Sequence, residues 1–147
     1  MWNKISSKND LKNFMDKVYH FHDSCLKELK YVSGAYADEC AMYSVNDKRI
    51  LSVIFQGVCG KEIDFSVIEI EFIGLIKINM IPINELYSCE IHSATMILKN
   101  DYIYWYDSDN VPENELDNYK GILICASEVR WRIADEYLGS GDVYVLR

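Results

Sequence analysis

The stretch Phe65 to Ile73, F-S-V-I-E-I-E-F-I, decides the fold class of this chain. Its Ile68, Ile70 and Phe72 alternate with two glutamates, and a period of two residues is typical of a β-strand. The apolar side would pack on a core while the glutamates face water, as in an antiparallel sheet with one solvated face. The alternation resumes after Gly74, so we expect a bend or bulge at this glycine in one long strand.

Much of the remaining chain has the same strand-like pattern. Alternating apolar residues predict further strands within Arg49 to Gln56, Leu86 to Leu98 and Gly121 to Ile133. Asn100-Asp101 separates two apolar runs, and Asn and Asp tolerate the positive φ that a two-residue hairpin turn requires. We expect Val143 to Leu146 to close the sheet.

One helix is predicted before the strands. Ser7 can cap it, and the apolar residues from Leu11 to Tyr19 fall at helical spacing, so we expect the helix to end near His20 to His22. Ser24 to Tyr36 fits either a strand or a helix, and its β surroundings favour a strand. Glu113 to Tyr119 can form one helical turn after a proline.

These elements predict an α+β, mainly β fold. We expect an N-terminal helix followed by a curved antiparallel sheet that is barrel-like or sandwich-like. The 147 residues suit a single domain spanning 1–147, because domains usually hold about 100–150 residues. Half of the residues are hydrophobic, which is enough apolar surface to exclude disorder as the main state.

Charge and cysteine content limit the expected partners and compartment. The chain has 15 Lys+Arg, 23 Asp+Glu and a net charge of −8, which argues against nucleic acid and favours a basic protein partner. We expect no membrane span, because no run approaches about 18 apolar residues. The polar residues after Met1 to Ile5 and the five scattered cysteines predict a cytoplasmic protein with buried free thiols. An open sheet edge would also let two copies pair as a homodimer.

The first candidate site is His20-Phe21-His22-Asp23. Two imidazoles at i and i+2 lie on one side of a strand and can share a metal, with Asp23 as an oxygen ligand and His92 as a third imidazole. The competing and favoured interpretation is a structural turn, in which His22 pairs with a carboxylate or a backbone carbonyl. We therefore expect no cofactor.

The second candidate site is Arg130-Trp131-Arg132. On a strand the two arginines share a face, so they can form cross-strand ion pairs with Glu69 or Glu71. The alternative is an anion pocket inside a barrel, with Trp105 on its wall. The ion pairs are the favoured interpretation. The predicted binding residues of both sites are His22, Asp23, Trp105 and Arg130.

A third candidate is the acidic segment Asp107 to Asp117. Its opening is similar to a calcium loop, but Pro112 stands where such a loop needs glycine and Asn118 stands at the position of the closing glutamate. We therefore expect a solvated loop, which could offer a contact surface to a basic partner.

Five short segments are spread along most of the chain. They are F-H-D-S-C-L-K-E-L (Phe21 to Leu29), S-G-A-Y (Ser33 to Tyr36), R-I-L-S-V-I-F-Q (Arg49 to Gln56), L-K-N-D-Y-I-Y-W (Leu98 to Trp105) and R-W-R-I (Arg130 to Ile133). Together they resemble a family of small uncharacterised bacterial proteins with an F-H-D-S motif. The resemblance implies a stand-alone cytoplasmic domain and carries over no catalytic residue. The size and acidity of the chain are also similar to those of immunity proteins, which neutralise a toxin by binding it.

The sequence predicts a non-catalytic binding or interaction protein, immunity-like in its action. Two alternatives stay open. The first is a small-ligand-binding β-barrel, in which Arg130 and aromatic side chains would hold an apolar or anionic ligand. The second is a metal-dependent hydrolase that uses His20, His22 and Asp23, because a bound metal would lower the pKa of a coordinated water.

Overall fold

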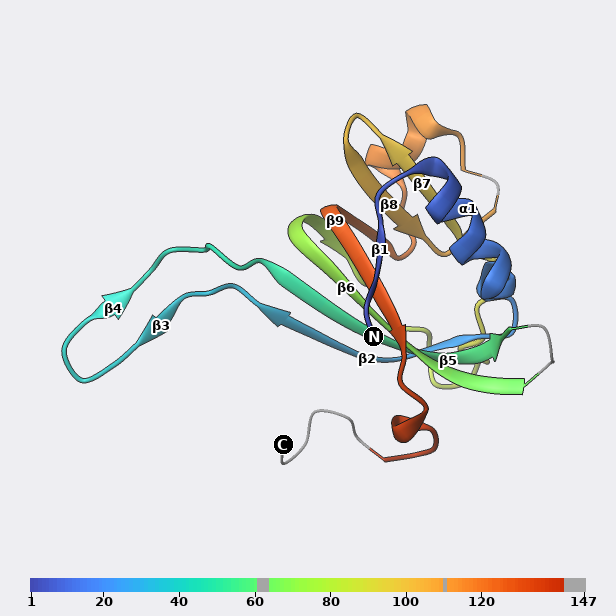
Figure 1. Cartoon of the computed structure of the whole chain (residues 1–147), viewed down its shortest axis with the longest axis horizontal. Coiled ribbons are helices and arrows are strands. Elements are labelled where there is room, and N and C mark those ends of the chain that lie inside the picture. Colours follow the sequence, from blue (N-terminus) through green and yellow to red (C-terminus); the bar gives the residue numbers. More distant parts are fainter. Residues whose placement is uncertain (61–63, 110, 142–147) are drawn as a thin grey trace.

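Long antiparallel strands form the centre of the fold in the computed structural model, which describes residues 1–60, 64–109 and 111–141 (Figure 1). The strands of the main sheet are β2 (Cys25–Val32), β5 (Ile50–Cys59), β6 (Asp64–Asn79), β9 (Leu123–Ile133), β8 (Tyr102–Tyr106) and β7 (Thr95–Lys99), in that spatial order. The short strand β1 (Asn3–Ile5) pairs with β9 further along the side that β8 occupies. The predicted last strand at Val143 to Leu146 lies outside the described residues.

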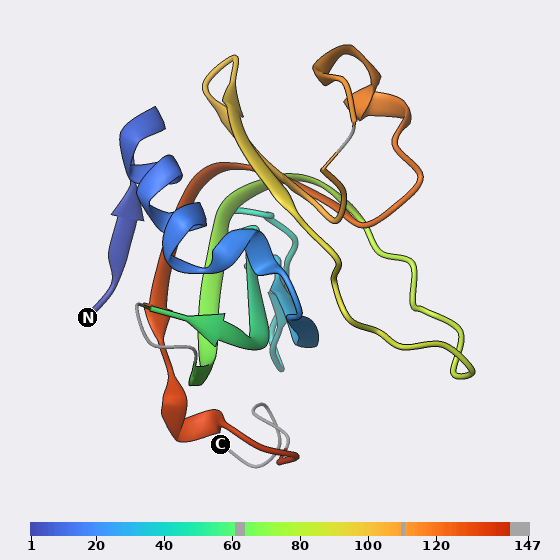
Figure 2. The same ribbon diagram turned by 90° about the vertical axis from the view of Figure 1, so that its right-hand side faces the viewer.

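The sheet is strongly curved, and helix α1 (Lys8–Lys17) lies on its concave side (Figure 2). One cause of the curvature is the bulge in β6 between Leu75 and Lys77, directly after Gly74 with φ of 65°. Within the described ranges the outer strands β2 and β7 do not pair, so the sheet stays open and does not close into a barrel. The predicted curved antiparallel sheet after an N-terminal helix is therefore confirmed in its open form.

The concave face of the sheet carries the core. Ile68, Ile70 and Phe72 of β6 are fully buried there, as their alternation predicts. Phe14 and Met15 of α1 pack against the same cluster. Burying a side chain of this size contributes about 1.5–3 kcal/mol, so the strands and helix depend on one another for stability.

The convex face carries two cross-strand ion pairs. Arg132 contacts Glu69 at 2.6 Å, and Arg130 contacts Glu71 at 2.5 Å. The predicted pairing between these strands is therefore confirmed. The expectation that Glu69 faces water is wrong, because this residue is buried beneath its arginine partner, which also reaches Glu136 of the 3-10 turn η3 (Asp135–Tyr137).

Local turn and cap predictions agree with the structure at several points. The Ser7 side chain accepts the Asp10 N–H at 3.1 Å and so caps α1. Asn100 and Asp101 have φ of 52° and 65° between β7 and β8, as a tight hairpin turn requires. The expected turn after Pro112 is η2 (Glu113–Asn118). Among the described residues, no helix has the length and apolar character needed to cross a bilayer.

Three sequence predictions differ from the structure. Only the last part of Leu86 to Leu98 is a strand, because residues 80–94 form a loop in which the Asn84 side chain accepts the Leu86 N–H and turns the chain. The helix ends at Lys17 rather than near His20, where a left-handed turn follows. All five cysteines are free thiols, but Cys40 and Cys89 are exposed rather than buried because they lie in segments outside the core.

The hairpin between β2 and β5 extends beyond the sheet as a narrow arm (Figure 1). We define the arm as residues 33–48, which contain β3 (Tyr36–Ala37) and β4 (Met42–Tyr43). The weak preference for a strand over Ser24 to Tyr36 is confirmed, with β2 and β3 separated by a short irregular stretch.

Candidate functional site

The F-H-D-S segment (Phe21 to Ser24) follows α1 through a left-handed turn, η1 (Tyr19–Phe21), with which it shares Phe21, and it leads into β2. Tyr19, His20 and Phe21 have φ of 51°, 52° and 60°, and Asp23 has φ of 58°. Bulky residues in this region are uncommon, since each costs about 1–2 kcal/mol. Burial of the Phe21 ring offsets this cost: the ring is fully buried, with aromatic neighbours at centroid distances of 4.8–5.9 Å, namely Phe14, Phe55 and Trp105.

The turn presents His22 and Asp23 at the surface next to His92. The Nδ1 atom of His22 lies 2.7 Å from the backbone oxygen of His92, and the two imidazoles meet edge to face at 5.7 Å. The Nε2 atom of His22 lies 3.4 Å from the Asp23 carboxylate. These contacts match the structural turn that the sequence favours, because both ring nitrogens of His22 have neighbours within the chain.

His20 points to a different partner. Its Nε2 atom lies 3.5 Å from Asp16 of α1. The structure therefore brings His22, Asp23 and His92 together and leaves His20 apart from them. In the part of the chain that the structure describes, no three His, Cys, Asp or Glu side chains are grouped so that they could hold a metal ion.

The other two predicted binding residues lie elsewhere. Trp105 is fully buried in the core against Phe21 and Phe55, so its ring supports the turn from beneath and cannot contact a partner. Arg130 lies on the convex face, where it pairs with Glu71 and stacks over Trp2 at 4.6 Å. The four predicted binding residues thus do not converge on one site.

The acidic segment Asp107 to Asp117 is tied to the fold at its beginning; position 110 lies outside the described residues. The Asp107 carboxylate accepts the Tyr119 hydroxyl at 2.5 Å and the Ile122 N–H at 3.0 Å. Burial and this carboxylate raise the pKa of Tyr119. Asp107 therefore has a structural role that the sequence did not indicate.

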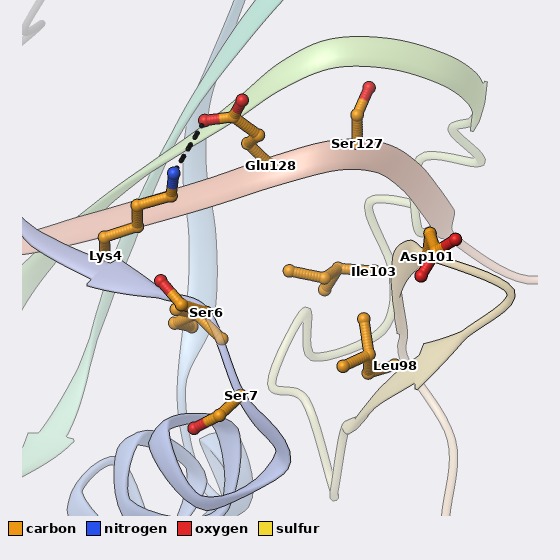
Figure 3. Close-up of a pocket in the computed structure, with 9 residues that line it drawn as sticks. Lys4, Ser6, Ser7, Leu98, Asp101, Ile103, Ser127 and Glu128 are labelled. Carbon is orange, nitrogen blue, oxygen red and sulfur yellow. Dashed lines mark ion pairs between the residues drawn. The ribbon is translucent and has the colours of Figure 1, made fainter.

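A pocket of about 260 Å³ lies where β1 and β8 meet β9 (Figure 3). Lys4 extends away to pair with Glu128 at 3.3 Å. Leu98 and Ile103 supply an apolar wall. In Figure 3 the Asp101 side chain lies apart from the Lys4–Glu128 pair.

The arm carries several exposed apolar side chains. Its large apolar side chains are exposed, and Met42 exposes 76% of its surface. They are Tyr36, Met42, Tyr43 and Val45. The arm also carries three acidic residues and one lysine, Asp38, Glu39, Asp47 and Lys48, so its net charge is −2. The arm thus combines exposed apolar side chains with a net negative charge in one segment.

The arm is ordered by contacts within itself. The rings of Tyr36 and Tyr43 stack at 5.0 Å across the strand pair. The Asp38 carboxylate accepts the N–H groups of Cys40 and Ala41, each at 2.9 Å, and these bonds lower the pKa of Asp38. These contacts hold the tip of the arm in one turn.

Sequence reasoning missed the arm and the exposed loop at residues 80–87. The arm leaves a weak signal, since Asp38 marks a turn between short apolar runs. The sequence does not indicate that those apolar runs are exposed, because their exposure depends on how far the hairpin extends past the neighbouring strands.

Comparison with family models, curated proteins and solved structures gave no match. The resemblance to a bacterial family therefore stays a prediction.

Proposed function

We propose that this chain is a non-catalytic binding protein that uses its arm to contact a basic protein partner. The observation that carries the proposal is the exposure of large apolar side chains on an acidic arm that stands clear of the sheet (Figure 1). A partner would bury these side chains and gain about 25 cal/mol per Å² of apolar surface. The mode of action is that of an immunity protein, which acts by occupying a surface of its target.

Charge supports the choice of a basic partner. The chain has a net charge of −8, and the arm carries part of it next to its apolar side chains. Such a field attracts a cationic surface and raises the association rate, and this effect weakens as salt is added. The five free thiols fit a reducing compartment, and we propose that the interaction takes place in the cytoplasm.

Site-specific crosslinking tests the proposal. A photoreactive amino acid replaces Met42 on the arm, and in a matched control it replaces Leu138, which is also exposed but lies far from the arm in sequence. We expect a crosslinked product with a basic protein from the Met42 position alone. Equal products from both positions, or none from the arm, would contradict the proposal.

Binding by the purified pair then tests the arm chemistry. We expect Glu39→Lys and Met42→Ser each to weaken the affinity, because they remove an acidic and an apolar contact. The loss from Glu39→Lys should shrink at high salt, whereas the loss from Met42→Ser should persist. Calorimetric titration at two salt concentrations measures both, and unchanged affinity of both variants would exclude the arm as the interface.

A further inference from the structure

A second exposed apolar surface lies on the loop between β6 and β7, which we call the apolar loop (residues 80–87). Leu86 and Tyr87 expose 83% and 74% of their surfaces. Met80, Ile81 and Ile83 are also exposed. The loop extends away from the sheet as a separate excursion of the chain (Figure 2).

An apolar groove of about 380 Å³ lies beside the apolar loop. Its lining includes Met80, Ile81 and Ile83 of the loop itself and, from the other side of the groove, Leu26, Ile91 and Ile122. Three polar side chains, Glu90, His92 and Asp107, also line it. Leu86 and Tyr87 do not line the groove. The same loop therefore supplies two protruding apolar side chains, Leu86 and Tyr87, and one wall of the apolar groove.

The apolar loop is held in a defined shape. The Leu86 N–H binds the Asn84 side chain at 2.9 Å, and the Tyr87 N–H binds the Asn84 carbonyl at 3.0 Å. Further along, Ile91 exchanges two backbone hydrogen bonds with the F-H-D-S turn, donating to Ser24 at 2.7 Å and accepting from Asp23 at 3.1 Å. The protruding side chains are therefore presented by a fixed turn.

We propose that two copies of this chain form a two-fold symmetric dimer in which Leu86 and Tyr87 of each copy lie in the apolar groove of the other. A two-fold interface uses the same patch on both copies, so it needs one surface that supplies both the protruding part and the hollow. The apolar loop and its groove meet this requirement within a single stretch of chain. The dimer would use this loop rather than a sheet edge.

The exposed area agrees with what a dimer needs. Taking about 200 Å² for a large side chain, the five exposed apolar side chains of the loop offer on the order of 600 Å². This area is at the upper end for an apolar patch on a monomer. Two copies would bury about 1,200 Å², which reaches the lower bound of specific interfaces, and the groove walls add to it.

The protruding part of the apolar loop carries few charges. The apolar loop has one charged residue, Glu85, among its eight residues, and the groove lining adds Glu90 and Asp107, whose carboxylate already accepts hydrogen bonds from Tyr119 and Ile122. At physiological salt, charges more than about 8 Å apart are largely screened from one another. The repulsion between two copies of an acidic protein therefore depends mainly on the charges at the contact, and it is weakest where these are few. The protruding part of the loop, residues 80–87 with a single charge, therefore suits a second copy. A small ligand in the groove would leave Leu86 and Tyr87 exposed.

Sedimentation velocity of the full chain at micromolar concentrations tests the dimer. We expect the wild type to have twice the monomer mass of 17.1 kDa, and the variant Leu86→Ser with Tyr87→Ser to have the monomer mass. The matched control is Met42→Ser with Tyr43→Ser on the arm, which should stay dimeric. Circular dichroism checks that each variant is folded, as the exposure of all four side chains predicts.

Two results would overturn the dimer. One is a monomeric wild type, including a monomer whose groove takes up the apolar dye 8-anilinonaphthalene sulfonate. The other is a folded Leu86→Ser, Tyr87→Ser variant that stays dimeric. Since the readout is mass without any partner protein, its failure is separate from failure of arm binding.

Discussion

Replacing Phe21 by alanine tests whether the F-H-D-S segment is a structural anchor. The ring is fully buried, and a phenylalanine buries about 150–250 Å², so at about 25 cal/mol per Å² its burial contributes about 4–6 kcal/mol. Alanine keeps part of that area, and we expect Phe21→Ala to lower the free energy of unfolding by about 3–5 kcal/mol. With a urea dependence of about 2 kcal/mol per molar, the midpoint falls by about 2 M.

Urea unfolding followed by circular dichroism measures this change against two controls. Phe65→Ala removes a ring that is 70% exposed, and we expect a change below about 0.5 kcal/mol. His22→Ala removes an exposed imidazole with one hydrogen bond, which contributes about 1 kcal/mol. If Phe21→Ala shifts the midpoint no more than these controls, the buried ring does not hold the left-handed turn and our account of the segment fails.

Three further changes probe the sheet and its neighbours. Glu69→Ala should cost about 3 kcal/mol in urea unfolding, because it removes the buried partner of Arg132 and leaves that arginine only its longer contact with the exposed Glu136. Glu128→Ala in an exposed pair should cost below about 1 kcal/mol. Burial and a neighbouring carboxylate raise the pKa of Tyr119. The contribution of this hydroxyl to stability is therefore complete below about pH 10 and falls as the pH rises further. Unfolding midpoints measured at about pH 8 and above about pH 10 should show a smaller fall for Tyr119→Phe than for the wild type. A Cβ at Gly57 would lie 1.9 Å from the Ser24 hydroxyl, so Gly57→Ala should cost about 1–3 kcal/mol, and adding Ser24→Gly should restore part of the thermal midpoint.

Features set by local chemistry could be predicted from the sequence. The alternation at Ile68, Ile70 and Phe72 placed one face of β6 in the core, and Ser7 located the start of α1. The Asn100-Asp101 turn followed from the tolerance of these residues for positive φ. Each of these depends on residues a few positions apart, so a short window of sequence contains the required information.

Features set by distant contacts could not be predicted. The left-handed turn at Tyr19 to Phe21 depends on burial of one ring among Phe55 and Trp105, which are distant in sequence. Trp105 belongs to this core, although its position on a strand also suited a pocket wall. The loop at residues 80–94 is apolar enough to resemble a strand, but Ile91 pairs with Ser24 only in an isolated bridge.

The arm also affects which substitutions this protein can tolerate during evolution. Its tip side chains, such as Tyr36 and Met42, lie outside the core, so replacing them alters little of the free energy that folds the sheet. Under the proposed function, the residues that bind the partner and the residues that fold the sheet therefore lie in separate segments. The proposal then implies that substitutions within sixteen residues (33–48) can change the bound partner while the sequence of the sheet and helix stays the same.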